Sequence, residues 1–467
     1  MKVAIIGCGY VGLPSGVGLA ELGNDVICID QDAQRISELQ QGRIPLYEED
    51  LPEMFTRNVA LGRLKFTTSM QEGVTDAEVV IIAVGTPPHP VTHEADLKFV
   101  YSAATELAVY LKGYTVIATK STVPVATGDS LETLLRAKNP HAEFDVVSFP
   151  EFLREGHALY DFLHPDRIVV GTDSAKACAV IKKLYAQFDG QDKFIFVKRR
   201  SAEVIKYAAN SFLAMKIHYI NEMANFCEKT GADIQEVARG MGADSRIGAA
   251  FLRPGPGFGG SCFPKDTLAL AFMAQQNGVN LDLVNATIEG NQKRKEEMAA
   301  KILQAVHDID QPRVAVWGLA FKNGTDDCRE SPAIEIIKHL LQKKIKVTAY
   351  DPQGMQSAQH ILGSKIAYAS GPVAAAQDAD VLAVLTEWPS FKQVDLGQLA
   401  AVMRGKLIID TRNILEPTTV VRAGFAYQGV GISLLSAAEQ ETAAASTTKA
   451  QEESRPHAPS TTVPPSV

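Results

Sequence analysis

Short apolar runs, separated by longer mixed segments, recur through the first 200 residues. The first run, VAII at residues 3–6, stops at glycines. Later runs lie in 78–87, 114–124, 143–151, 168–172 and 193–197. Several of them end in small, polar or Pro residues, as expected at the carboxyl edge of a parallel sheet, where ligands bind. The pattern predicts a doubly wound α/β domain over residues 1–200, with helices between the strands.

Residues 201–230 contain neither glycine nor proline. They predict one helix of roughly eight turns, about 45 Å long at 1.5 Å per residue, which suits a spine between domains. Lys206 and Asn210 are four residues apart and therefore share a face of this helix. A solvated polar stripe is the alternative explanation for them.

The rest of the chain predicts two further domains and a tail. A glycine-rich passage and more helix extend a central helical domain over 201–308. Residues 312–352 repeat the strand, glycine turn, helix and strand of the opening, and two more strands follow. We therefore expect a second Rossmann-like domain over 309–435, whose turn lacks the first glycine pattern and suits a different nucleotide. Residues 436–467 contain no Leu, Ile, Phe, Tyr or Trp and predict a disordered tail.

Composition excludes several classes of function. The chain has 467 residues, 46% of them apolar and 21% charged, and a formal net charge of −8, which disfavours a nucleic-acid surface. No apolar stretch approaches the ~20 residues that span a bilayer, and no signal peptide is recognisable. The six cysteines show neither a C-x-x-C pair nor zinc-ligand spacing with histidine, so we expect free thiols, no metal and a cytoplasmic location.

The opening segment carries a dinucleotide-binding pattern. Gly7, Gly9 and Gly12 form G-x-G-x-x-G directly after the first strand, and Asp30 ends the next apolar run. The glycines permit a tight turn and close approach of a pyrophosphate, and the helix N-terminus favours its charge. Asp30 would bind the ribose hydroxyls and repel a 2′-phosphate, which favours NAD over NADP. A plain βαβ unit with packing glycines is the alternative.

A single cysteine stands in the glycine-rich stretch GFGGSCFPKD, residues 257–266. A thiolate can add to an aldehyde, and an NAD enzyme can then remove a hydride to leave a thioester that water hydrolyses. Lys265 or Lys206 could lower the pKa of Cys262, and Asp266 could position or deprotonate the water. The pattern predicts an enzyme that oxidises past the aldehyde.

Taken together, these segments resemble the UDP-glucose/GDP-mannose dehydrogenase family over about residues 1–435. The segments that carry the resemblance are GCGYVGLP, VGTP, KSTVP, PEFLREG, DRIVVG, KYAANSFLAMKI, RIG, PGFGGSCFPKD, GLAFKNGTDDCRESP and DTRN. FPKD and KYAANSFLAMKI are similar to the branch that acts on UDP-glucose. The sequence departs from the family at Phe149, where Asn is expected, and at His157, where a smaller residue is common.

The resemblance implies an NAD-dependent, four-electron oxidation of UDP-glucose to UDP-glucuronate. Cys262 would be the nucleophile, Lys206 and Asn210 would stabilise the oxyanion, and Asp266 would orient Lys206 and the water. The implied catalytic residues are Cys262, Lys206, Asn210, Asp266, Thr122 and Glu151. The implied cofactor-binding residues are Gly7, Gly9, Tyr10, Val11, Gly12, Asp30, Arg35, Thr86, Thr122, Glu155, Lys265 and Arg329. The implied substrate-binding residues are Glu151, Phe152, Leu153, Glu155, Lys206, Asn210, Arg246, Phe251, Leu252, Phe258, Gly259, Phe321, Lys322 and Arg412.

The resemblance also implies an assembly, because Arg246 corresponds to a residue that reaches the partner subunit's substrate. We therefore expect a homodimer or a larger homo-oligomer.

Three alternatives remain open. The same chemistry could act on a UDP-N-acetyl sugar or GDP-mannose. A two-electron 3-hydroxyacid dehydrogenase also places Lys and Asn one helical turn apart, but it needs no cysteine. An NAD-sensing regulatory protein could keep the fold without the chemistry.

Overall fold

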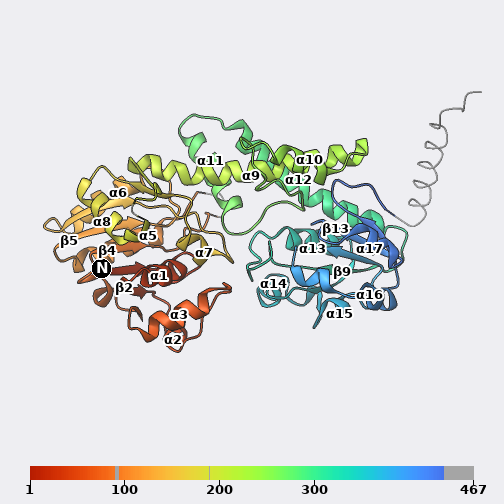
Figure 1. Cartoon of the computed structure of the whole chain (residues 1–467), viewed down its shortest axis with the longest axis horizontal. Coiled ribbons are helices and arrows are strands. Elements are labelled where there is room, and N and C mark those ends of the chain that lie inside the picture. The colour runs from red at the N-terminus through yellow and green to blue at the C-terminus, as the bar shows by residue number, and fades with distance from the viewer. Residues whose placement is uncertain (90–93, 189, 436–467) are drawn as a thin grey trace, which may run out of the picture.

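The computed structural model describes residues 1–89, 94–188 and 190–435. Two α/β lobes lie side by side, and a long helix with its neighbours runs along one side of both (Figure 1). The predicted tail at 436–467 lies outside the described residues. No helix in the described ranges is long and apolar enough to cross a membrane.

The N-terminal lobe is built on an eight-stranded sheet in the order β3-β2-β1-β4-β5-β6-β7-β8. The strands are β1 (Lys2–Ile6), β2 (Asp25–Ile29), β3 (Leu64–Thr67), β4 (Val79–Ile82), β5 (Tyr114–Thr119), β6 (Glu143–Ser148), β7 (Ile168–Gly171) and β8 (Phe194–Val197). All neighbours are parallel except β6 and β7, which pair antiparallel at Ser148 and Gly171. The order reverses between β1 and β4, and the carboxyl ends of strands at such a switch point are where doubly wound folds bind ligands.

Helices cover both faces of this sheet. They are α1 (Gly12–Glu21), α2 (Ala33–Gln40), α3 (Leu51–Ala60), α4 (Met70–Val74), α5 (Lys98–Leu107), α6 (Thr127–Lys138), α7 (Ala158–Leu163) and α8 (Ala175–Leu184). Successive residues of β1 enter different cores: Val3 and Ile5 pack with α1 and α3, whereas Ala4 and Ile6 pack with α4 and α5. Burial of each such Ile stabilises the fold by about 1.5–3 kcal/mol.

The predicted spine is the 32-residue helix α9 (Arg199–Thr230). It ends at Gly231, whose φ of 77° lies in the left-handed region that glycine adopts most readily. Helices α10 (Ile234–Gly242), α11 (Phe263–Gln276) and α12 (Asp282–Ala305) follow, and α11 and α12 pack against α9. In Figure 1 the helix α9 bridges the two lobes. The domain boundaries predicted at residues 200 and 308 stay predictions.

The second lobe repeats the first topology with a parallel six-stranded sheet in the order β11-β10-β9-β12-β13-β14. Its strands are β9 (Arg313–Trp317), β10 (Lys346–Tyr350), β11 (Ala367–Tyr368), β12 (Val381–Val384), β13 (Leu407–Asp410) and β14 (Ala426–Gln428). Its helices are α13 (Pro332–Gln342), α14 (Met355–Leu362), α15 (Pro372–Ala375), α16 (Leu396–Val402) and α17 (Pro417–Arg422). The expected fold class of two doubly wound domains joined by a long helix is confirmed.

Candidate active site

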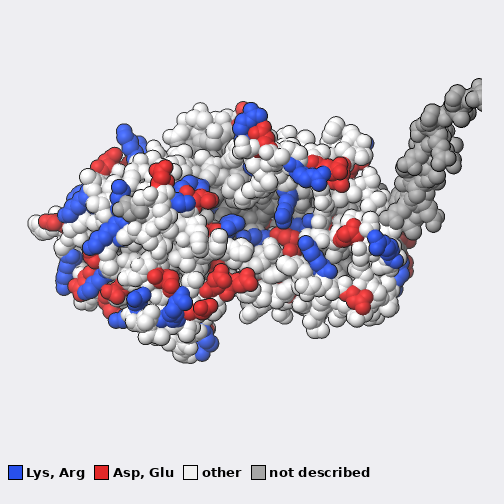
Figure 2. Space-filling view, viewed as in Figure 1, with Lys and Arg blue, Asp and Glu red and all other residues white. Residues whose placement is uncertain are grey.

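A cavity of about 470 Å³ opens where the lobes meet the central helices. Its walls come from the carboxyl ends of β5 and β6, from α9, from the cysteine loop and from the Phe321–Lys322 turn of the second lobe. Figure 2 shows a hollow in the middle of the molecule, with basic side chains along it and acidic ones close by. Segments far apart in the sequence therefore supply one site.

Cys262 lies in this cavity directly before the first residue of α11. The glycines before it allow the tight approach: a Cβ on Gly260, whose φ is +81°, would lie 2.7 Å from the ring of Phe321. Burial raises the pKa of the Cys262 thiol to about 11, although the charge of Lys206 acts in the opposite direction. The expected lowering by Lys206 or Lys265 is thus outweighed, and the free protein holds a thiol at neutral pH.

Lys206 and Glu151 form a buried ion pair. The Nζ of Lys206 lies 2.8 Å from Oε1 of Glu151, and the side chains are 4% and 5% exposed. Burial opposes both charges, but the charge of Glu151 keeps the pKa of Lys206 above its usual value, and the charge of Lys206 keeps the pKa of Glu151 below its own. Both groups therefore stay charged at neutral pH.

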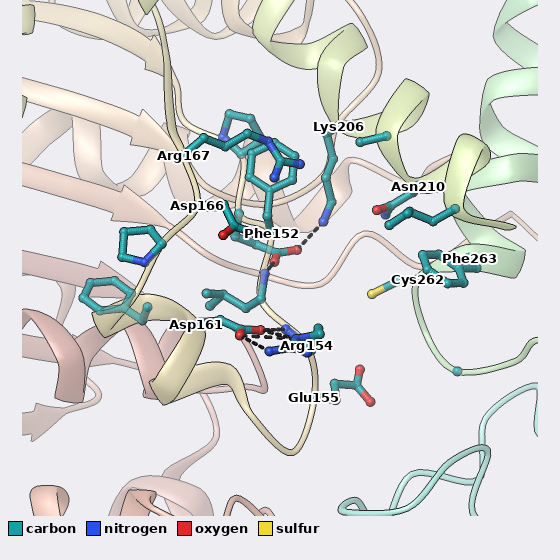
Figure 3. Close-up of a pocket in the computed structure, with 18 of the residues that line it drawn as sticks. Phe152, Arg154, Glu155, Asp161, Asp166, Arg167, Lys206, Asn210, Cys262 and Phe263 are labelled. Carbon is teal, nitrogen blue, oxygen red and sulfur yellow. Dashed lines mark hydrogen bonds and ion pairs between the residues drawn. The ribbon is translucent and has the colours of Figure 1, made fainter. Parts of the chain in front are cut away.

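Asn210 lies one turn further along α9 and is held by Asp266. Its Nδ2 donates to Oδ2 of Asp266 over 2.6 Å, and Lys265 Nζ lies 2.5 Å from the other carboxylate oxygen. Asp266 was expected to orient Lys206, and that role stays a prediction: the charge of Asp266 raises the pKa of Lys206, while the hydrogen bond of Lys206 goes to Glu151, just after β6. Figure 3 shows Lys206, Asn210 and Cys262 directed toward the same space.

The glycine turn after β1 fits a dinucleotide. Gly7 has a φ of +103°, and a Cβ on Gly12 would lie 1.8 Å from the Gly7 carbonyl oxygen, so both positions require glycine. A Cβ on Gly9 meets nothing within 4 Å, which leaves that side open to a ligand. At the end of β2, Asp30 accepts from the Cys8 amide and from Arg35 at 2.8 and 3.0 Å. These residues form an anion site beside a fixed carboxylate.

Most of the other predicted cofactor residues lie around this turn, whereas Lys265 lies in the first turn of α11 beside Asp266. Thr86 donates through Oγ1 to the Thr122 carbonyl oxygen, 2.9 Å away, after neighbouring strands β4 and β5. Val11 directly precedes α1. Tyr10 donates to Oδ1 of Asp326 in the second lobe over 3.0 Å. The glycine turn is therefore tied to the other domain.

Arg329 and Glu155 meet near the same contact. The guanidinium of Arg329 holds Asp327 through Nε and Nη2 and lies 5.3 Å from the centre of the Tyr10 ring. Its Nη2 is 3.7 Å from Oε1 of Glu155, which also accepts from Ser261 over 2.5 Å. Burial, reinforced by Asp327, raises the pKa of Glu155 to about 7.

Most of the predicted substrate residues face the cavity. Phe152, Leu153, Phe251, Gly259, Phe321 and Lys322 line it together with Glu151, Glu155, Lys206 and Asn210. Leu153 also fixes Glu151 by donating its amide to Oε2 over 2.6 Å.

Four of the predicted substrate-binding residues do not line the cavity of this chain. Leu252 is 3% exposed and packs in a core cluster with residues of α12 and β9. Phe258 is buried against the ring of Phe263. Arg412 lies behind Phe321 and donates to its carbonyl oxygen over 2.9 Å. Arg246 is 87% exposed and pairs with Asp244.

Among the cavity residues that sequence reasoning missed, three are charged or polar groups that contact other residues of the site. Ser261, beside the cysteine, holds Glu155. Arg167 stacks on Phe152, with 3.8 Å from its guanidinium carbon to the ring centre. Lys120 is 4% exposed and also lines the cavity. Lys120 follows β5 directly, and this position at a strand's carboxyl end is the signal that could have found it.

In the described part of the chain, no group of three or more His, Cys, Asp or Glu residues could hold a metal.

Two doubly wound lobes, a dinucleotide turn and a half-buried cysteine beside Lys206 and Asn210 define an NAD-dependent oxidoreductase. Comparison with known families agrees. The models of the UDP-glucose/GDP-mannose dehydrogenase family match residues 1–189 (NAD binding domain), 200–293 (central domain) and 315–417 (UDP binding domain). The chain belongs to the UDP-glucose/GDP-mannose dehydrogenase family.

Similar proteins cover nearly the whole chain. A UDP-glucose 6-dehydrogenase of Rhizobium meliloti (strain 1021) is 48% identical over 92% of this chain and 99% of its own. A UDP-glucose 6-dehydrogenase of Bacillus subtilis (strain 168) is 44% identical over 92% of this chain and 93% of its own. The structure of a UDP-glucose dehydrogenase from Pyrobaculum islandicum matches with a TM-score of 0.85 and 34% identity, and the match covers 92% of this chain and 97% of that one. The resemblance inferred from the sequence is confirmed.

Proposed function

We propose that this chain oxidises UDP-glucose to UDP-glucuronate in two successive two-electron steps. The observation that carries the proposal is the position of Cys262, in one cavity with Lys206, Asn210 and Glu151. A single oxidation of an alcohol needs no nucleophile, whereas oxidation to the acid needs a group that holds the aldehyde. Two similar proteins that carry the name of this activity support the choice of sugar.

The overall reaction balances as alcohol plus two NAD and water giving carboxylate, two NADH and three protons. Bound NAD supplies the electron acceptor, which takes up a hydride in each oxidation. The residues proposed to hold it are Gly7, Gly9, Tyr10, Val11, Gly12, Asp30, Arg35, Thr86, Thr122, Glu155, Lys265 and Arg329. The open side of Gly9 and the carboxylate of Asp30 support this assignment.

Cys262 is proposed to attack the aldehyde carbon through Sγ. A C–S bond forms, the carbonyl π bond breaks, and negative charge develops on the oxygen. The charged Lys206 and the amide of Asn210 point into this space and would stabilise that oxyanion. Because the thiol is protonated in the free protein, its proton must pass to water as the C–S bond forms. The resulting thiohemiacetal is oxidised to a thioester.

Hydrolysis of the thioester needs a placed water. We assign this role to Glu151 and Thr122, at the ends of β6 and β5, with Asp266 acting through Asn210. Water adds to the thioester carbon, the C–S bond breaks, and the departing thiolate takes up a proton that the water gives up. The low pKa of Glu151 keeps it a carboxylate that can accept a hydrogen bond from that water.

The nucleotide part of the substrate is proposed to extend toward the second lobe. Phe321 and Lys322 line the cavity there, and Arg412 supports them from behind. Phe152, Leu153, Phe251 and Gly259 would enclose the sugar. The UDP binding domain that matches residues 315–417 supports this orientation. Leu252 and Phe258 would shape the wall from beneath.

We further propose a homodimer through α9. Phe212, Tyr219 and Phe226 recur every seven residues on this helix and are 58%, 44% and 63% exposed. An exposed aromatic row at this spacing is typical of a helix that packs against another. Arg246 lies outside the cavity of its own chain, which supports its proposed reach into a partner's site. Light scattering coupled to size exclusion tests the dimer, and a monomer at micromolar concentration contradicts it.

The reaction is tested by counting NADH per sugar consumed. We expect two NADH from UDP-glucose and no free aldehyde. Cys262→Ala should lose turnover to the acid, and Cys262→Ser should stall at most at an ester adduct visible by mass spectrometry. Cys178→Ala on α8 is the matched control and should keep its activity. A faster reaction with GDP-mannose or a UDP-N-acetyl sugar would overturn the choice of substrate, and two NADH from Cys262→Ala would overturn the thioester.

The cytoplasmic location also stays a prediction, which fractionation of the source cells tests.

A further inference from the structure

A buried lysine that the proposed chemistry does not use lies in the active-site cavity. Lys120 directly follows β5, where its amide donates to the Ile82 carbonyl oxygen over 2.8 Å. Its side chain is 4% exposed. Burial of an ammonium is unfavourable unless nearby groups compensate for the lost water. A lysine kept at such a position therefore needs a reason.

The surroundings of Lys120 are aromatic. Its Nζ lies 4.7 Å from the centre of the Phe149 ring and 5.9 Å from that of Phe162. Tyr185 packs edge-on against Phe149, with 5.6 Å between the ring centres. The faces of aromatic rings attract a cation, so this aromatic cluster of Phe149, Phe162 and Tyr185 can hold the ammonium without a counter-ion in direct contact. Among the described residues, Lys120 forms no ion pair within 4.0 Å, whereas Lys206 pairs with Glu151.

The register of the sheet places Lys120 beside the catalytic pair. β5 and β6 are parallel neighbours with Thr119 opposite Ser148, and the Phe149 amide donates to the Thr119 carbonyl oxygen over 2.9 Å. Lys120 and Glu151 therefore follow the ends of adjacent strands and line the same cavity. The charge of Lys120 helps to keep the pKa of Glu151 low, and Glu151 acts in return on Lys120.

We infer that Lys120 is a positioning residue that adds a second buried positive charge beside the Lys206–Glu151 pair. The three groups together carry one net positive charge, since Glu151 balances only one of the two lysines. That excess favours the oxyanion on the substrate and keeps Glu151 ionised to hold water. This inference rests on the proposed function for its catalytic consequence.

The charge should be lost under mildly alkaline conditions. Burial lowers the pKa of Lys120 to about 8, with Glu151 raising it and Lys206 lowering it in smaller measure. Tyr185, the other titratable group of this aromatic cluster, keeps its proton because burial raises the pKa of its phenol. An arginine at position 120 would stay charged throughout this range.

The test compares Lys120→Met, Lys120→Arg and the wild type. The matched control is Lys295→Met on α12, since Lys295 is also 4% exposed but lies outside the cavity. We expect Lys120→Met to lower kcat roughly tenfold or more, because one buried charge is removed from the site. The ratio of kcat for Lys120→Arg to that of wild type should rise as pH increases above 8. A merely structural role would give a flat ratio, which overturns the inference.

The thermal stability of these variants reports on the charge of Lys120 independently of any activity assay. The folded protein binds the Lys120 proton less tightly than the unfolded chain, so wild-type stability is lost as pH falls through about 8. Lys120→Met should therefore melt at or above the wild-type Tm at pH 7, and the gap should narrow toward pH 10. A Tm below wild type at pH 7 overturns the buried-charge assignment. If wild type oxidises a different nucleotide sugar, the proposed function fails, and the same variants compared on that sugar still decide the role of Lys120.

Discussion

The Nζ of Lys206 on the spine helix lies 2.8 Å from the Glu151 carboxylate at the end of β6. This pair joins the central helices to the first sheet inside the cavity that contains Cys262. Burial opposes both charges, yet each stabilises the other. A lysine held in this way is a fixed positive charge and cannot serve as a base, so its role in the reaction is electrostatic.

Loss of a donor to the oxyanion should therefore reduce kcat far more than it raises KM. For Lys206→Ala or Asn210→Ala we expect a fall in kcat of about 10²–10³, since one such donor contributes roughly 3 kcal/mol to the transition state. Steady-state kinetics with UDP-glucose measure it, and the Tm of each variant reports folding. A raised KM with unchanged kcat would mark both groups as ground-state binders.

The reactivity of Cys262 should increase steeply with pH. Because burial raises the pKa of this thiol to about 11, little thiolate is present at pH 7 in the free enzyme. Alkylation by iodoacetamide, followed by peptide mass spectrometry, should accelerate about tenfold per pH unit between 7 and 10, since the thiolate is the reactive form. Lys206→Met should slow it further by removing the charge that lowers the pKa. Rapid labelling at pH 7 that is independent of pH contradicts this prediction.

Cofactor choice should depend on Asp30. Its carboxylate, 3.0 Å from Arg35, stands where a 2′-phosphate would be repelled. Wild type should strongly prefer NAD in kcat/KM. Asp30→Ala removes the repulsion and releases Arg35 to meet a phosphate, so the preference should shrink. Asp30→Ala in which Arg35 is also replaced by Ala serves as the control and should gain less NADP activity. Equal use of both cofactors by wild type would refute the assignment.

Stability should depend on the charge of Glu155. Burial is the main cause that raises its pKa to about 7, above its ordinary value of 4.5. The folded protein thus holds this proton more tightly than the unfolded chain, and the resulting stability, complete below pH 4.5, is lost as pH rises through 7. The Tm of Glu155→Gln should exceed that of the wild type by more at pH 8 than at pH 5. Differential scanning calorimetry measures the two gaps, and an equal gap would mean that Glu155 titrates normally.

The sequence predicted most of the strands that form the two sheets. The run at 114–124, for example, begins with the strand β5, which is buried in the sheet interior and is rich in β-branched residues, so the sequence pattern indicates it directly. Short edge strands such as β3, β11 and β14 were not predicted. They are two to four residues long and are defined by backbone pairing, which leaves little pattern in the side chains.

Local signals by themselves determined the dinucleotide turn and the spine. Gly7 and Gly12 are required by backbone geometry within one βαβ unit, and α9 lacks glycine and proline over its whole length, so neighbouring residues suffice to predict both. Cys262 was likewise singled out by its glycine-rich loop.

Only the tertiary structure decided which charges meet. Asp266 adjoins Lys265 in sequence and holds Asn210, while Lys206 pairs with Glu151, 55 residues away. Lys120 reaches the same cavity because β5 and β6 are neighbours in the sheet. A pKa depends on burial and on charges within a few ångströms, and neither is encoded by sequence spacing. The residue types of the site could therefore be predicted from the sequence. Their protonation states depend on burial and neighbouring charges, which exist only once the two lobes and the spine helix enclose the site.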